Sequence, residues 1–73
     1  MGVPRFVAEY RNYAQKLVAK SALPIEEKDK RIMALDHIYN MAFLNCVSVA
    51  DAMQAITNEL MKLKEEIENG EIL

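Results

Sequence analysis

The sequence predicts an all-α protein, either a three-helix bundle or a helical hairpin with a shorter N-terminal helix. The 73 residues have room for one small domain, which we place over residues 1–73. A composition with 2 Gly, 2 Pro and 5 Met favours helices over a sheet, which needs many turns. Apolar residues recur at steps of three and four in segments near residues 4–20, 24–45 and 48–69. These segments are the expected helices.

The first expected helix begins beside Pro4, because the first turn of a helix tolerates proline. Polar residues such as Glu9 and Lys16 lie opposite a single apolar stripe. The members of this stripe are Phe6, Val7, Tyr10, Tyr13, Ala14, Leu17 and Val18. Residues 21–24 are expected to link this helix to the next.

The second expected helix carries acidic residues at its start, at Glu26, Glu27 and Asp29, where the exposed amides favour negative charge. Two apolar rows follow side by side, and Asp36 and His37 belong to a narrow polar stripe that Asn40 completes. The rows contain Ile32, Leu35, Tyr39, Ala42, Cys46, Ala34, Ile38 and Met41, and Met33, Phe43 and Leu44 widen them. We therefore expect more apolar surface here than two neighbouring helices can cover.

The third expected helix starts at Ser48, where Asp51 completes an arrangement similar to a capping box, after a turn at residues 45–47. Its apolar residues have the spacing of a coiled coil: Val49, Met53, Ile56, Leu60, Leu63 and Ile67. Asn69 and Gly70 are expected to end the helix, with Ile72 or Leu73 folding back as the apolar contact of the cap. The C-terminal end of this helix carries glutamates at 65, 66, 68 and 71, where the helix dipole disfavours negative charge. We therefore expect the last turn to fray.

The lone cysteine and the lone histidine indicate no chemistry. Cys46 has apolar neighbours, and we expect it to be a buried free thiol. His37 lies nine residues before it, on the opposite side of a helix, so the two cannot form a local metal site. Asp36 beside His37 is expected to be solvated or to bond across to another helix. Phosphate-binding, metal-binding and nucleophile motifs are missing, so the sequence predicts neither an enzyme nor a cofactor.

The charge is uneven along the chain. Residues 1–31 hold seven basic and four acidic side chains, a balance of +3, and residues 32–73 hold two and seven, a balance of -5. One alternative function is a helix-turn-helix transcription regulator built on residues 42–60, with Lys28, Lys30 and Arg31 contacting DNA phosphates. The net charge of -2 makes binding to nucleic acid unfavourable.

The favoured function is that of a small cytoplasmic regulator or adaptor that acts by helix-mediated protein binding, as phage and mobile-element proteins do. We expect two kinds of partner, a second copy of the chain in a homodimer and another protein, and no membrane. The predicted interface lies on the second and third helices. It consists of Met33, Ile38, Met41, Phe43, Leu44, Met53, Ile56, Leu60, Leu63 and Ile67.

Overall fold

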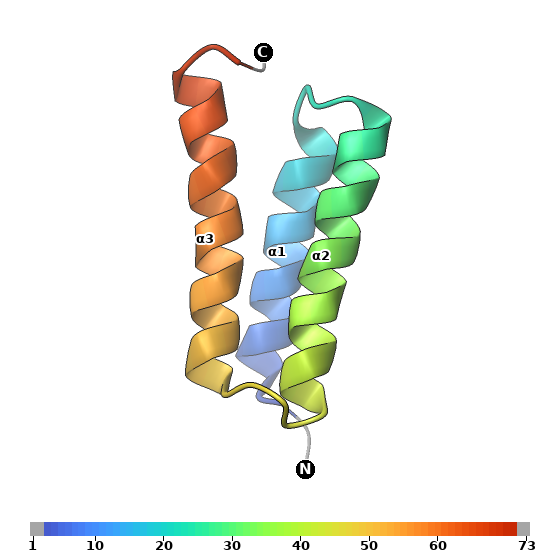
Figure 1. The fold of residues 1–73 in the computed structure, drawn as a ribbon, viewed down its shortest axis with the longest axis vertical. Coiled ribbons are helices and arrows are strands. Elements are labelled where there is room, and N and C mark those ends of the chain that lie inside the picture. The colour runs from blue at the N-terminus through green and yellow to red at the C-terminus, as the bar shows by residue number, and fades with distance from the viewer. Residues whose placement is uncertain (1–2, 72–73) are drawn as a thin grey trace.

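The computed structural model describes residues 3–71, which form three helices along one common axis (Figure 1). The helices are α1 over Arg5–Lys20, α2 over Ile25–Phe43 and α3 over Val49–Glu68. Every helix packs against the other two, and the molecule measures 41 × 19 × 17 Å. The all-α prediction is confirmed, and the structure is a three-helix bundle rather than a hairpin with an appended helix.

The core is a slender column where the three helices face one another. Leu35 of α2 and Ile56 of α3 are fully buried, as is Val7 of α1. The other buried apolar residues among those described are Ala14, Val18, Leu23, Ala42, Ala52 and Leu63. Because several of these are small, much of the apolar surface predicted from the sequence lies outside the core.

The helix starts follow the sequence signals. α1 and α2 begin directly after Pro4 and Pro24, whose backbones are extended. In α2, Glu26 and Glu27 occupy the first turn, whereas Asp29 lies beyond it. The amide of Asp51 donates to Ser48 Oγ at 3.1 Å, which confirms the predicted cap of α3.

The end of α2 differs from the prediction. The helix stops at Phe43 rather than near residue 45, because Asn45 adopts a left-handed backbone with φ of 62°. The amides of Asn45 and Cys46 then donate to the carbonyls of Ala42 (3.0 Å) and Met41 (2.8 Å). This pair of bonds is the Schellman motif, which closes a helix and turns the chain away.

The end of α3 is closed by the same motif, as the sequence predicted. Gly70 has φ of 74°, its amide donates to the carbonyl of Ile67 at 3.1 Å, and the amide of Glu71 donates to that of Glu66 at 2.9 Å. The predicted contact from Ile72 or Leu73 lies outside the described residues.

One charged side chain enters the bundle, on α2. Arg31 is buried, and its guanidinium donates to both carboxylate oxygens of Glu66 on α3, at 2.5 and 2.7 Å. Its Nε donates to Glu27 at 3.0 Å. The hydrogen bonds that Arg31 donates to Glu66 lower the pKa of Glu66, and the same bonds raise the pKa of Arg31. A cation of the basic half of the chain is thus paired with an anion of the acidic half.

Candidate interaction surface

The predicted interface residues fall into three groups in the structure. Met33 (70%), Leu44 (65%), Ile67 (53%) and Phe43 (51%) are exposed. Partly buried positions are Ile38, Met41, Met53 and Leu60. Ile56 and Leu63 belong to the core. The ten residues therefore differ widely in how much surface they could offer to a partner.

Ile56 and Leu63 pack mainly within the chain's own core. Their side chains are 0% and 4% exposed, so in this conformation they offer little surface to a partner. The seam of α3 meets α1 and α2 of its own chain, and these positions occupy its centre. Spacing alone could not reveal this, because a seam looks the same whether its partner is in the same chain or another.

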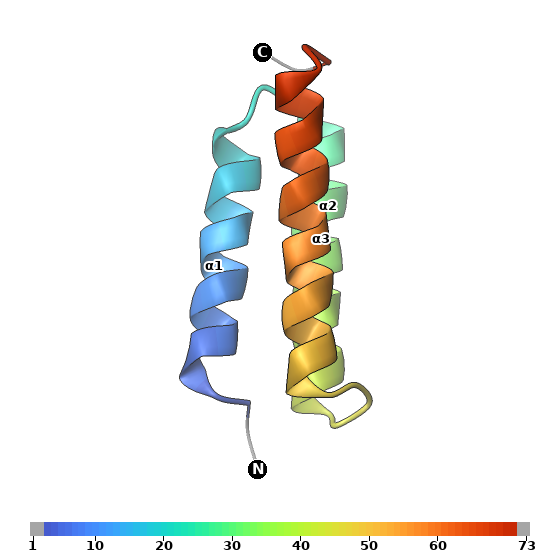
Figure 2. The ribbon, with the colours of Figure 1, turned by 90° about the vertical axis from the view of Figure 1, so that its left-hand side faces the viewer.

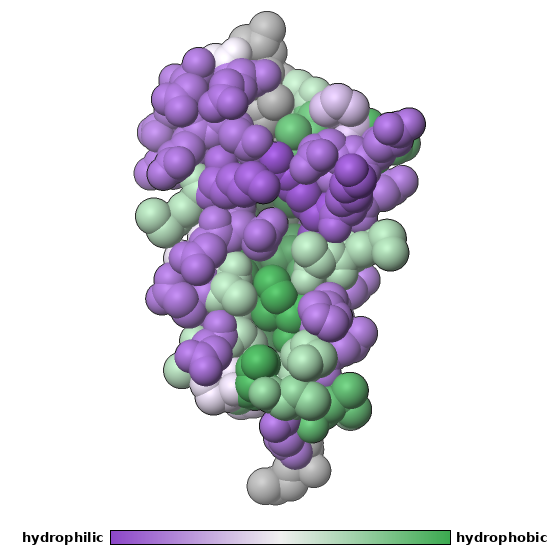
Figure 3. Space-filling model, viewed as in Figure 1, coloured by the Kyte–Doolittle hydropathy of each residue, from purple (hydrophilic) through white to green (hydrophobic). Residues whose placement is uncertain are grey.

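An exposed apolar patch lies at the turn between α2 and α3, formed by Phe43, Leu44 and Val47, which we call the turn patch. On the side shown in Figure 3, apolar surface is gathered towards the end of the molecule that carries this turn, and hydrophilic residues cover the other end. Asn45 reverses the chain between these residues, so three apolar side chains are held outside the core within five positions.

The aromatic residue of the turn patch, Phe43, packs against α2 and is linked through it to α1. The ring of Phe43 stacks on Tyr39, with ring centres 6.4 Å apart, and the guanidinium of Arg11 on α1 lies 4.4 Å from the centre of the Tyr39 ring. Arg11 Nη1 also lies 3.4 Å from the carboxylate of Asp36. A chain of contacts from α1 thus supports Phe43, the aromatic residue of the patch.

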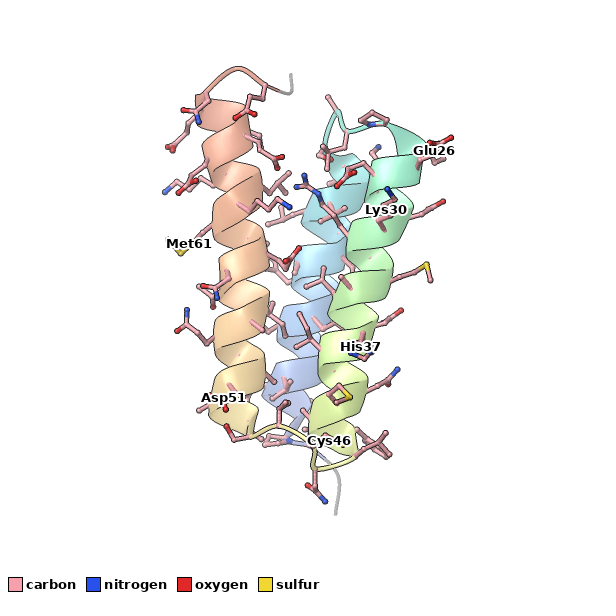
Figure 4. All side chains as sticks on the ribbon, in the orientation of Figure 1. Glu26, Lys30, His37, Cys46, Asp51 and Met61 are labelled. Carbon is pink, nitrogen blue, oxygen red and sulfur yellow. The ribbon has the colours of Figure 1, made fainter. Side chains whose placement is uncertain are left out.

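Cys46 is exposed at this turn, so the prediction of a buried thiol is wrong (Figure 4). The prediction assumed that Cys46 continues the apolar row of α2. The helix ends before it, and the left-handed residue Asn45 directs the following chain to the surface. No group of histidine, cysteine or carboxylate side chains suited to a metal ion is present within residues 3–71.

The polar stripe of α2 makes a cross-helix contact, as predicted. Gln15 of α1 donates through Nε2 to Asp36 at 2.9 Å and to the carbonyl of Ile32 at 3.1 Å. His37 is exposed on the outer side of α2 (Figure 4). Asp36 is therefore engaged in packing between helices rather than placed as a general base beside His37.

A second apolar feature, a groove between α1 and α3, has a volume of about 470 Å³. Tyr13 and Leu17 form its α1 wall, and Leu60, Leu63 and Ile67 form its α3 wall. Lys20, Ser21, Lys64 and Glu68 line it as well. Tyr13 is 56% exposed and Leu17 36%, so this part of the groove is open to solvent. We call it the α1–α3 groove.

The sequence prediction missed the α1 side of this groove. It described the seven apolar residues of the first helix as a single apolar stripe and did not separate its two edges, whereas only Val7, Ala14 and Val18 are buried in α1. Phe6, Tyr13 and Leu17 lie along the outer edge of the stripe and are exposed. The width of the stripe was the available signal, because a helix in a small bundle buries a narrower face.

Two of the three cations assigned to DNA phosphates are engaged within the chain. Arg31 is buried in its contact with Glu66 and Glu27, and Lys28 Nζ donates to the carbonyl of Ala19 at 2.9 Å. Lys30 projects from α2 into solvent (Figure 4). This surface therefore does not present the cluster of cations that phosphate binding needs.

Comparisons of the chain with protein-family models, with curated protein sequences and with solved structures give no match. No helix within residues 3–71 is both long and apolar enough to span a membrane. The turn patch and the α1–α3 groove are the candidate interaction surfaces among the residues described.

Proposed function

We propose that the protein is a small cytoplasmic regulator or adaptor that acts by binding another protein through the turn patch. The observation that carries the proposal is the exposure of Phe43, Leu44 and Val47 at one end of the bundle. A few large side chains, aromatic ones prominent among them, supply most of the free energy of protein association when they are buried at the centre of an interface. A role in phage or mobile-element regulation fits this mode of action and is part of the proposal.

The contacts that hold Phe43 and the backbone of the turn support binding through this patch. Phe43 is stacked on Tyr39, and the backbone of the turn is closed by two hydrogen bonds. A partner that covers this patch therefore loses little free energy in ordering it. Cys46 lies in the same turn, so its accessibility to a thiol reagent reports whether the patch is covered.

The helix-turn-helix alternative has little structural support. In that motif the two helices cross at roughly 90–120°. Here α2 and α3 lie side by side in opposite directions (Figure 1), so α3 does not project from the bundle to enter a groove. The pairing of Arg31 with Glu66 also removes a proposed phosphate contact.

The test compares partner capture by three forms of the protein. The wild type, a double variant with Phe43→Ser and Leu44→Ser, and a control with Met33→Ser are used as baits in extracts of the source cell. Met33 is 70% exposed on α2 and lies outside the turn patch, so the control removes an exposed apolar side chain without altering the patch. The captured protein is identified and purified, and the dissociation constant of its complex with each of the three forms is measured.

We expect the double variant to weaken binding by about 10-fold or more and the Met33 control to bind as the wild type does. Protection of Cys46 from a thiol reagent by the purified partner is expected for the wild type. Equal affinity of the double variant and the wild type would show that the turn patch is not the binding site.

A further inference from the structure

An arginine of α1 contacts the aromatic pair that carries the turn patch. The start of α1 lies at the same end of the bundle as the turn between α2 and α3 (Figure 2). Tyr39 and Phe43 are four residues apart on α2, so their side chains lie on one side of that helix. The guanidinium of Arg11 lies 4.4 Å from the centre of the Tyr39 ring. Tyr39 therefore lies between a cation of α1 and the aromatic residue of the patch.

The guanidinium of Arg11 is held along its edges by polar groups. Its Nη2 and Nε donate to the side-chain oxygen of Asn12, at 2.9 and 3.3 Å. Its Nη1 lies 3.4 Å from the carboxylate of Asp36, which also accepts a hydrogen bond of 2.9 Å from Gln15. A guanidinium whose edge N–H groups are engaged still has its planar face free for an aromatic ring. The Arg11 side chain is only 22% exposed, so water screens this contact less than it screens a fully exposed cation.

Phe43 depends on the Tyr39 ring for support. Phe43 is the last residue of α2, so no further helical turn follows it, and the next residue, Leu44, is itself 65% exposed. Among the residues described, Tyr39 is the aromatic residue that stacks on Phe43, with ring centres 6.4 Å apart. This separation is within the range over which aromatic rings attract each other. The orientation of the Phe43 ring is therefore sensitive to the ring of Tyr39.

We propose that Arg11 is a positioning residue for the turn patch and acts on Phe43 through Tyr39. The cation holds the ring of Tyr39, and that ring holds Phe43 in the orientation that a partner meets. α1 thereby contributes to the affinity of a patch whose three residues all lie outside it. A side chain held in its bound orientation loses less conformational freedom when a partner covers it. This inference rests on the proposed function, since it concerns how tightly the turn patch binds.

The expected effect of Arg11 on affinity is smaller than that of the patch residues. A cation above an aromatic ring at a partly exposed site changes an equilibrium constant by about two- to five-fold. Loss of Phe43 and Leu44 themselves is expected to weaken binding by about 10-fold or more. Arg11 therefore adjusts the affinity of the patch, and the patch residues supply the contact with the partner.

The first test uses the free protein and needs no partner. Three-bond couplings across the Cα–Cβ bond of Phe43, measured by NMR, report how this side chain is distributed among its rotamers. Arg11→Ala should spread Phe43 over more rotamers and shift its ring resonances, while the helical circular dichroism stays unchanged. The control Lys16→Ala removes an exposed cation of α1 and should leave the Phe43 couplings as in the wild type. Unchanged Phe43 couplings in Arg11→Ala would overturn the proposal.

The second test asks whether Arg11 acts through Tyr39. Tyr39→Leu removes the ring between Arg11 and Phe43, so it should itself alter the Phe43 couplings, whereas Tyr39→Phe keeps the ring and should preserve them. Adding Arg11→Ala to Tyr39→Leu should change the couplings no further, because residues that act along one path are not additive. Additive effects of Arg11→Ala and Tyr39→Leu would overturn the action through Tyr39.

The third test measures affinity for the partner captured through the turn patch. The dissociation constant should rise by about two- to five-fold for Arg11→Ala and stay unchanged for Lys16→Ala. Unchanged affinity of Arg11→Ala, despite altered Phe43 couplings, would overturn its role in binding. Failure of the proposed function gives a different result. The double variant with Phe43→Ser and Leu44→Ser would then bind as the wild type does, while the Phe43 couplings would still depend on Arg11.

Discussion

Asn45 determines where α2 ends. Its φ of 62° is a conformation that costs most residues about 1–2 kcal/mol and that glycine adopts freely. Asparagine is the residue that most often replaces glycine there. At the end of α3 the same role falls to Gly70, where an added Cβ would contact nothing within 4 Å. The sequence revealed the stop at Gly70, but Asn45 was one of several polar residues near the end of its helix.

We predict opposite effects of one substitution at two positions of the chain. Asn45→Gly should raise the free energy of unfolding by about 0.5–1 kcal/mol, because it relieves the left-handed backbone. Asn40→Gly should lower it by a few tenths of a kcal/mol, since Asn40 is exposed within α2 and glycine is a poor helix former. Urea unfolding measures both changes. A destabilising Asn45→Gly would show that its side chain, rather than its backbone, holds the turn.

At the scale of the elements, the sequence predicted each helix but not how it is rotated in the bundle. The cap at Ser48 and the closing Gly70 are local signals, so both could be identified. Which edge of an apolar stripe is buried depends on the other two helices. Tyr13 is exposed and Ile56 is buried for that reason. Cys46 was misplaced because its position depends on the backbone of the preceding residue.

The contact between Arg31 and Glu66, which we call the Arg31–Glu66 clamp, joins α2 to α3 and was also missed. From the sequence, Arg31 was considered only as a contact to DNA phosphates. Glu66 was considered only among the glutamates at the end of the third helix, and the prediction that the last turn frays followed from the helix dipole alone. The clamp holds Glu66 against α2, and the Schellman motif caps the helix beyond it. We therefore expect amide exchange to be slow up to Glu66 in the wild type and fraying to be confined to the residues after it.

The Arg31–Glu66 clamp predicts a specific loss of stability in acid. Because Arg31 lowers the pKa of Glu66 below its ordinary value of 4.5, the ionised carboxylate stabilises the folded state. This contribution is complete above that ordinary value and is lost as the pH falls through the lowered pKa of the folded protein. Glu66→Gln should destabilise the protein by about 1.5–3 kcal/mol at neutral pH and weaken this part of the acid dependence.

The measurement is urea unfolding between neutral pH and pH 3, with Glu65→Gln as the matched control on the same helix. Glu65 is exposed and makes no ion pair with the residues described. The control should keep the acid dependence of the wild type. In the Glu66→Gln variant, amide protection at the end of α3 should retreat towards Leu63, the last buried residue of the helix. If the free energy of unfolding of the two variants depended on pH in the same way, the Arg31–Glu66 clamp would be excluded as the cause of the acid dependence.

At the scale of the whole molecule, shape and charge together argue against DNA binding. The bundle has a net charge of -2, its helices lie along one axis, and both Arg31 and Lys28 are engaged internally. We predict no shift of duplex DNA at physiological salt, and none at about 50 mM salt, where electrostatic contacts strengthen. A mobility-shift assay with random-sequence and source-genome fragments tests this. DNA binding that is lost when Lys28, Lys30 and Arg31 are neutralised would contradict this prediction. It would mean that Arg31 leaves its contact with Glu66 to bind a phosphate.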